Sequence, residues 1–144
     1  MTQEPHLTDS LLFSPLTLRG ITLRNRTVMS PMTMYSSVDG KLDDYHVCYL
    51  GARAAGGFAL VFGEQMAITP DGRTTTSCAG IWDGSQIEGH ARVTAMIRRM
   101  GAVPAIQPQN YIWRGFVALT EWAVRVAAVV TPRVAFDHRL RLVH

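Results

Sequence analysis

The stretch Asn25-Arg26-Thr27-Val28-Met29-Ser30-Pro31-Met32-Thr33-Met34-Tyr35 decides the fold, because it reads as a strand that stops abruptly in a loop. Residues 27–29 predict a short buried strand, which the proline ends because proline lacks the N–H that a sheet needs. In parallel β/α folds, the loops at the carboxyl ends of the strands converge and carry the chemistry. We therefore expect Met32, Thr33 and Tyr35 to face a shared pocket, the plain alternative being a strand that ends in an ordinary turn.

The composition of the 144-residue chain fits one globular domain, because 47% of its residues are hydrophobic and 17% are charged. Fourteen basic residues against eleven acidic ones give a net charge of +3, which is too dilute to indicate a nucleic-acid partner. The longest apolar segment, residues 115–130, contains Glu121 and Arg125 and is too short to cross a membrane. The N-terminus lacks the pattern of a secretory signal. We expect a cytoplasmic protein with no nucleic-acid or membrane partner.

The spacing of the two cysteines indicates neither a metal site nor a disulfide framework. Cys48 and Cys78 form neither a C-x-x-C motif nor a cluster with histidine at metal-ligand spacing. The sequence therefore predicts no metal site and no disulfide framework. His46 lies within a predicted helix, where a structural hydrogen bond is the expected role.

Strands and helices are predicted to alternate along the chain. Residues 16–23 predict an antiparallel hairpin around Arg19-Gly20. The later elements are a helix from Asp43 or Asp44 to about Ala55, a strand over 58–62 ending at 63–65, a helix opened by a Ser85/Glu88 capping box and closed by Gly101, and a strand over 102–106 finishing at Gln107. This order is typical of a parallel sheet with right-handed crossovers.

The carboxyl ends of the three parallel strands are predicted to meet at one rim. They carry residues 31–33, then Glu64 and Gln65, and finally Gln107. Polar strand ends above apolar strands suit a site that holds a flat heteroaromatic ring.

Several spaced motifs appear in order along residues 11–107. They are residues 12–16 (LFSPL), 23–26 (LRNR), 30–32 (SPM), 52–57 (ARAAGG), 72–73 (GR), 80–83 (GIWD), 101–102 (GA) and 106–107 (IQ). This series resembles the N-terminal part of old yellow enzyme type NADH:flavin oxidoreductases. The resemblance implies an α/β fold that is a partial (β/α)8 TIM barrel, with an N-terminal hairpin and about three β/α units. It also implies FMN at the barrel rim and hydride transfer from NAD(P)H to an electron-poor small-molecule acceptor.

The resemblance assigns roles to the loop after the first parallel strand. It implies that Pro31, Met32 and Thr33 lie along FMN and that Tyr35 lies near the substrate. A hydroxyl at Thr33 would donate to the flavin O4 atom and tune its potential.

Two glutamines complete the implied cofactor site. Gln107 matches the glutamine that binds the polar edge of the flavin, where an amide can donate and accept at once. Gln65 takes the place of a small residue whose backbone meets the flavin, so only a main-chain role carries over. No catalytic residue is assigned, because the family's carbonyl-binding His/His or His/Asn pair and its usual proton-donor tyrosine have no counterpart in the chain.

The sequence departs from the family pattern after Gln107, where it continues Pro108-Gln109-Asn110-Tyr111 in place of a small residue, histidine and a Gly-Arg element. We therefore expect two parts: residues 1–107 as the N-terminal part of an FMN-binding TIM barrel, and residues 108–144 as a divergent tail. One hypothesis is that this tail is an out-of-frame continuation of a longer coding sequence. The other is a tail that packs on the open sheet.

Two functions from different classes stay open on the sequence. The first is an FMN-dependent oxidoreductase, and the second is an inactive truncated relic or interaction module with no bound flavin. A β/α enzyme for a phosphorylated substrate is disfavoured, because the chain has neither a G-x-G-x-x-G nor a P-loop pattern. An open sheet edge exposes unpaired backbone, so we expect the tail or an oligomer to cover it and the chain to be marginally stable alone.

Overall fold

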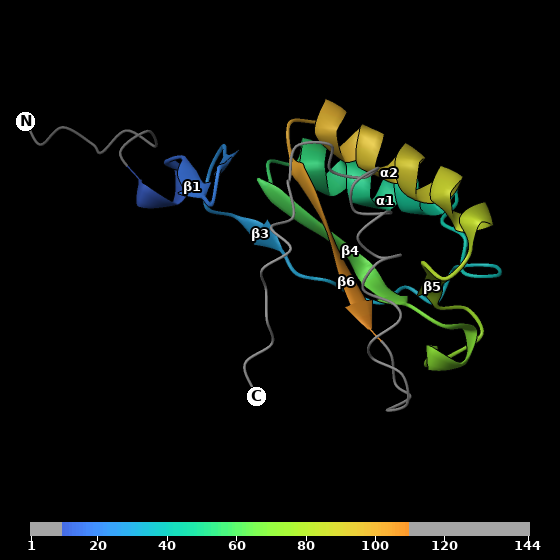
Figure 1. Ribbon diagram of the computed structural model, residues 1–144. Helices are drawn as coiled ribbons and strands as arrows, with labels where there is room; N and C mark the ends of the chain where they lie inside the picture. Colours follow the sequence, from blue (N-terminus) through green and yellow to red (C-terminus); the bar gives the residue numbers. More distant parts are fainter. Residues whose placement is uncertain (1–9, 110–144) are drawn as a thin grey trace, which may run out of the picture.

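The computed structural model describes residues 10–109, in which two helices lie over one face of a small sheet (Figure 1). The elements in chain order are η2 (Leu11–Phe13), β1 (Leu16–Leu18), β2 (Ile21–Leu23), β3 (Val28–Met29), α1 (Asp44–Ala55), β4 (Leu60–Ala67), η3 (Pro70–Gly72), β5 (Ala79–Gly80), η4 (Gly84–Gln86), α2 (Ile87–Arg99) and β6 (Val103–Gln109). This alternation confirms the predicted α/β class. No helix of this part of the chain combines the length and the apolarity that a membrane span requires.

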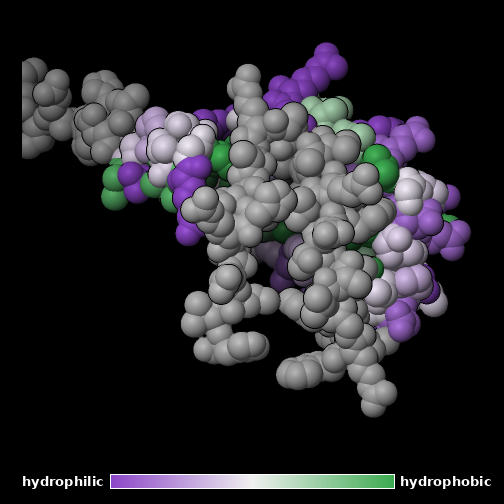
Figure 2. Space-filling model, in the orientation of Figure 1, coloured by the Kyte–Doolittle hydropathy of each residue, from purple (hydrophilic) through white to green (hydrophobic). Residues whose placement is uncertain are grey.

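The predicted hairpin is present at the N-terminal side. β1 and β2 pair antiparallel, with Leu16 opposite Leu23, and the turn places Arg19 and Gly20 at positive φ. Together with η2, the hairpin projects from the body of helices and sheet (Figure 1). This projecting segment exposes Leu11 and Phe13 to solvent, and Figure 2 shows its apolar and hydrophilic side chains side by side.

Arg24 connects the end of the hairpin to the ends of both helices. Its guanidinium donates to the backbone oxygens of Ala54 at 2.6 Å, Phe58 at 2.9 Å and Met100 at 3.0 Å. Ala54 lies in the last turn of α1, Phe58 follows that helix and Met100 caps α2, and backbone oxygens at helix ends lack partners within the helix. One positive side chain therefore satisfies both helix ends and fixes the start of β3.

The four-stranded sheet is parallel and is organised around β4. β6 pairs with β4 along its length, from Leu60 opposite Val103 to Ala67 opposite Gln109. β3 pairs with the first residues of β4 and β5 with the last, so both occupy the other edge of β4. The carboxyl ends of β3, β4 and β6 consequently point in the same direction, as predicted.

Two predicted strand ends were placed too early. β4 continues through Glu64 and Gln65 to Ala67, and β6 continues through Gln107 to Gln109. The polar residues did not end β4, because Glu64 is buried against partners from elsewhere in the chain. The rim residues of these two strands therefore lie within the sheet near its carboxyl end.

The first predicted helix is confirmed, and the start of the second is corrected. α1 begins after Asp43, which forms a capping box with His46. The Ser85/Glu88 box is wrong, because the box joins Asp83 to Gln86 and α2 begins at Ile87. The Asp83 carboxylate accepts from the Ser85 backbone at 2.8 Å, so the serine is a partner of the cap and does not form it.

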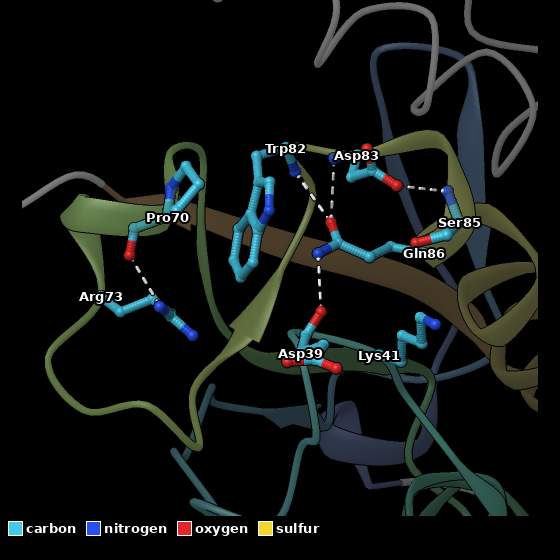
Figure 3. A pocket seen from close by; sticks show the side chains of 8 residues that line it. All are labelled: Asp39, Lys41, Pro70, Arg73, Trp82, Asp83, Ser85 and Gln86. Atoms are coloured by element: carbon cyan, nitrogen blue, oxygen red, sulfur yellow. Dashed lines mark hydrogen bonds between the residues drawn. The ribbon is translucent and has the colours of Figure 1, made fainter.

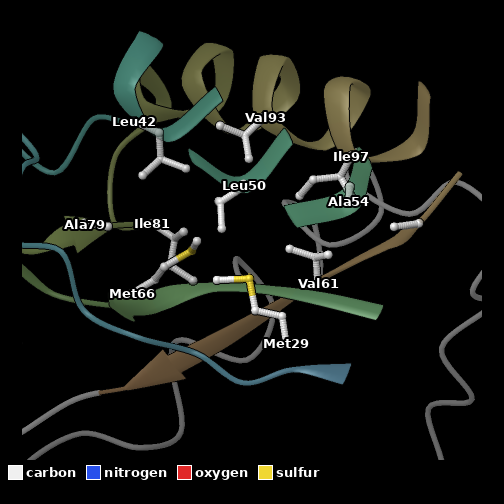
Figure 4. Close-up of a cluster of buried hydrophobic side chains, with 11 residues drawn as sticks. Met29, Leu42, Leu50, Ala54, Val61, Met66, Ala79, Ile81, Val93 and Ile97 are labelled. Atoms are coloured by element: carbon white, nitrogen blue, oxygen red, sulfur yellow. The ribbon is translucent and has the colours of Figure 1, made fainter. Parts of the chain in front are cut away.

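The hydrophobic core fills the space between the helices and the sheet (Figure 4). Val61 and Ala54 are fully buried, and Ile97 is almost so. Methionines Met29 and Met66 fill the sheet side of this cluster. The core therefore fixes one face of the sheet and leaves the opposite face to other contacts.

Candidate functional site

Gln65 and Gln107 are register partners on neighbouring strands. They face each other across the parallel pair β4–β6, where Cα partners lie about 4.8 Å apart. Gln65 is half-buried, and its amide nitrogen donates to the Thr74 hydroxyl at 3.4 Å. Gln107 is exposed. The two glutamines predicted for the rim are thus brought together near the carboxyl end of the sheet.

A β-bulge turns Gln65 toward the face of the sheet that carries no helix within residues 10–109, called here the helix-free face. The register between β4 and β6 shifts between Phe62 and Gln65. Val61 and Met66 both belong to the core cluster although five positions separate them, which regular alternation would place on opposite faces. The extra residue of the bulge resolves this conflict. Gln65 therefore shares the helix-free face with Phe62.

This helix-free face combines an apolar floor with two amides at one end. Leu60, Phe62 and Ala105 lie outside the core cluster and are half-buried. Gln65 and Gln107 follow on the same face, toward the carboxyl ends of the strands. A planar heteroaromatic that is apolar over its faces and polar along one edge fits such a surface. The residues present are thus compatible with the flavin that the sequence implied.

The loop after β3 reaches this end of the sheet from the other edge of β4. The backbone N–H of Met34 donates to Glu64 Oε2 at 3.0 Å, next to the bulge. Pro31 and Thr33 are half-buried, whereas Met32 is 48% exposed. β3 and β6 pair with opposite edges of β4. The strand that precedes Thr33 therefore lies two strand spacings, about 10 Å in total, from the strand that carries Gln107.

Tyr35 stands apart from the other predicted residues. Its side chain is 52% exposed and its backbone has a φ of 54°, in the left-handed region that tyrosine seldom adopts. The loop therefore holds Tyr35 outward in a turned conformation. No glycine or asparagine at this position signalled the positive φ in advance.

A buried polar network beneath the loop was not predicted from the sequence. His46 Nε2 donates to Glu64 Oε1 at 2.9 Å, and His46 Nδ1 lies 2.7 Å from Asp43 Oδ1. The structural hydrogen bond expected of His46 is present, but its partner Glu64 is a rim residue. A carboxylate in the middle of an apolar strand is the one sequence signal that could have indicated a buried partner.

The electrostatics of the two buried histidines differ. Burial by itself lowers the pKa of His46, but hydrogen bonds to Glu64 and Asp43 outweigh it, so the pKa is raised overall. Burial lowers the pKa of His90, whose one hydrogen bond at Nε2 goes to the Gly80 carbonyl at 2.8 Å. His46 is therefore biased toward the charged form and His90 toward the neutral form.

A separate hollow of about 370 Å³ lies among the loops beside the sheet (Figure 3). It is lined by Asp39, Lys41, Pro70, Arg73, Trp82, Asp83, Ser85 and Gln86. The Gln86 amide braces it, accepting from the Trp82 backbone at 2.9 Å and donating to the Asp39 carbonyl at 3.0 Å. None of the predicted cofactor residues lines this hollow, so we do not place the flavin there.

Comparisons with known proteins identify the family of the chain. The chain matches the NADH:flavin oxidoreductase / NADH oxidase family over residues 11–116, which extends past the end of the motif series at residue 107. An NADPH dehydrogenase of Bacillus licheniformis is 44% identical over 103 residues, covering 70% of this chain and 30% of that protein. The chain thus belongs to the NADH:flavin oxidoreductase family, and it spans about 30% of the length of this relative.

Solved structures show the same fold. Morphinone reductase in complex with tetrahydroNAD superposes with a TM-score of 0.66 at 29% identity, covering 71% of this chain and 28% of that one. An old yellow enzyme from Pichia sp. AKU4542 gives a TM-score of 0.66 at 24% identity, covering 73% and 28%. The described sheet is therefore an open part of a TIM barrel of the old yellow enzyme type, as predicted. The prediction of FMN with a nicotinamide reductant agrees with this family.

Proposed function

We propose that this chain provides part of the flavin-binding barrel rim of an FMN-dependent NAD(P)H oxidoreductase, an enzyme that reduces an electron-poor small-molecule acceptor. When bound, FMN supplies the carrier that takes a hydride from the nicotinamide and passes it to the acceptor. The observation that carries the proposal is the register pair Gln65–Gln107 on the helix-free face, with the loop after β3 tied to the same level of β4.

The glutamine pair would hold the polar edge of the cofactor. Gln107 is exposed, so its amide is available to donate one hydrogen bond and accept another. Gln65 already bonds to Thr74, so its contribution is assigned to the main chain of β4 beside the bulge. Two adjacent strands would in this way fix the rotation of the ring in its own plane.

The loop after β3 would hold the opposite side of the cofactor. Pro31 and Met32 would lie along the ring and exclude water from it. The Thr33 hydroxyl would donate to the flavin O4 atom, where negative charge increases on reduction. Tyr35, which the loop holds outward, would face the acceptor.

One edge of β6 has no partner strand in the described part of the chain. Among residues 10–109, no strand pairs with the edge of β6 that faces away from β4. We propose that residues 110–144 or a second copy of the chain cover it, because unpaired edges recruit further strands. The predicted division at residue 107 and the proposed out-of-frame origin of the tail stay hypotheses, since all but two residues of that tail lie outside the described part of the chain.

Titration with FMN tests the proposal directly. The purified full chain is added to FMN, flavin fluorescence is followed, and NAD(P)H is then supplied to the complex under nitrogen. Quenching that saturates, followed by bleaching of the yellow absorbance, supports the oxidoreductase. Fluorescence that stays at the level of free FMN at high chain concentration supports the alternative of a relic or interaction module without flavin.

A further inference from the structure

The His46–Glu64 pair joins three separate parts of the site. His46 belongs to the first turn of α1, Glu64 to the bulge of β4, and both are almost fully buried, at 2% and 3% exposure. Oε1 of Glu64 accepts from His46 Nε2 at 2.9 Å, and Oε2 accepts from the Met34 backbone N–H at 3.0 Å. Both oxygens of one carboxylate are therefore used, one toward the helix and one toward the loop.

The imidazole has further polar neighbours at both of its ring nitrogens. Asp43 Oδ1 lies 2.7 Å from Nδ1, and the hydroxyls of Ser36 and Ser37 lie 3.2 and 3.4 Å from Nε2. The two serines come from the same loop as Met34, a few residues further along. The loop after β3 is thus anchored to the pair at its backbone and at its side chains.

Stability alone explains this arrangement poorly. Removing two charges from water is costly, and buried ion pairs are often no more stabilising than apolar residues of similar volume. What such a pair provides is geometry, because its hydrogen bonds have fixed lengths and directions. The geometry that this pair fixes is the position of the loop at Met34 relative to the bulge that precedes Gln65.

We propose that His46 and Glu64 are positioning residues that preassemble the cofactor surface by fixing the loop of Thr33 against the Gln65–Gln107 register pair. Neither residue touches the cofactor in this scheme, which rests on the proposed function above. Thr33 is the residue before Met34, and Gln65 is the residue after Glu64. The bond from Met34 to Glu64 therefore helps to fix the loop that carries Thr33 against the strand that carries Gln65.

The deciding variant replaces the whole pair by apolar residues of similar size, His46→Leu with Glu64→Met. This double variant leaves no unpaired buried charge, so it is expected to fold with a midpoint of denaturation at or above that of the unmodified chain. The Met34 amide nevertheless loses its acceptor. We expect its hydrogen exchange, measured by NMR in the cofactor-free full chain, to become at least about tenfold faster. We expect FMN to bind about tenfold more weakly by fluorescence quenching.

His90→Leu is the matched control. It removes another buried imidazole, from α2, whose Nε2 donates to the Gly80 carbonyl and not to the loop. This variant should keep the Met34 exchange rate and the FMN affinity of the unmodified chain. Glu64→Gln, which retains an oxygen to accept from Met34, should recover most of the Met34 protection.

The two readouts separate failure of this inference from failure of the proposed function. A double variant that folds and protects Met34 as well as the unmodified chain overturns the inference, whether or not FMN binds. An unmodified chain that fails to bind FMN overturns the proposed function, and the exchange of Met34 then still decides whether the pair positions the loop.

Discussion

Gln65 lies directly opposite Gln107 in the parallel pair β4–β6, one residue beyond the bulge that turns it out of the core face. Gln65 is half-buried and donates to Thr74, whereas the Gln107 amide is exposed and can reach a ligand. Their position near the carboxyl ends of the strands is where TIM barrels place their chemistry. The pair is therefore the first target for mutation.

Gln107→Ala is expected to weaken FMN binding without unfolding the chain. The side chain is exposed, so its removal should change the free energy of unfolding by less than about 0.5 kcal/mol. Loss of one or two neutral hydrogen bonds to the cofactor should raise the FMN dissociation constant by about fivefold to tenfold. Thr17→Ala, on the exposed hairpin, is the control that should bind FMN normally. Equal affinities for the two variants would remove Gln107 from the site.

Thr33→Val is expected to lower the reduction potential of the bound FMN. The hydroxyl would bond more strongly to O4 when the flavin carries negative charge, so its loss penalises the reduced form. A difference of about 1 kcal/mol corresponds to a shift on the order of 20 mV for a two-electron couple. The potential is measured by reductive titration against a reference dye. Thr33→Ser should keep the unmodified potential, and a shift in the serine variant equal to that of valine would contradict the hydroxyl's role.

Patterns local to the chain predicted most of the elements. Asp43 and Gly56 mark the ends of α1 correctly, because a side-chain cap and a terminating glycine act within a few residues. The end of β4 was missed because the partner of Glu64 is His46, eighteen positions away. A polar residue normally ends a buried strand, but here a contact distant in sequence compensates for its burial.

The start of α2 likewise depends on a contact that is distant in sequence. The S-x-x-E spacing predicted a box of Ser85 with Glu88, on local rules alone. The structure instead uses a box of Asp83 with Gln86, in which Gln86 also donates to the Asp39 carbonyl, 47 positions away. For the same reason the register pairing of Gln65 with Gln107 could be expected only in outline, since the bulge that aligns them depends on the folded sheet.

Gly89→Ala is expected to be strongly destabilising despite the better helix propensity of alanine. A Cβ at Gly89 would lie 2.3 Å from the backbone oxygen of Leu42, so α2 or the segment before α1 would have to move. Overpacking of this kind costs roughly 1–3 kcal/mol or more, against a propensity gain of at most about 1 kcal/mol. Gly84→Ala is the matched control, because a Cβ there meets nothing within 4 Å. Urea denaturation should separate the two variants, and equal midpoints would contradict the close approach at Leu42.

His46 and His90 are expected to make opposite contributions to the pH dependence of stability. The pKa of His46 is raised, although burial opposes it, by its bonds to Glu64 and Asp43. Its contribution is therefore complete below the unfolded pKa of about 6.5 and is lost as pH rises from there through the folded pKa. Burial lowers the pKa of His90, so the unfolded chain takes up a proton that the folded chain excludes. Its neutral burial therefore destabilises the fold as pH falls below about 6.5.

Urea denaturation at a series of pH values checks this pair of signs. Each histidine contributes a slope of at most about 1.4 kcal/mol per pH unit within its own window. His90→Leu should flatten the loss of stability on the acid side of pH 6.5, and the double variant of His46→Leu with Glu64→Met should flatten the loss on the alkaline side. Both variants remove an imidazole from the buried region, so a general packing defect would lower their curves equally at every pH. Parallel curves that differ only in height would show that neither histidine changes its pKa on folding.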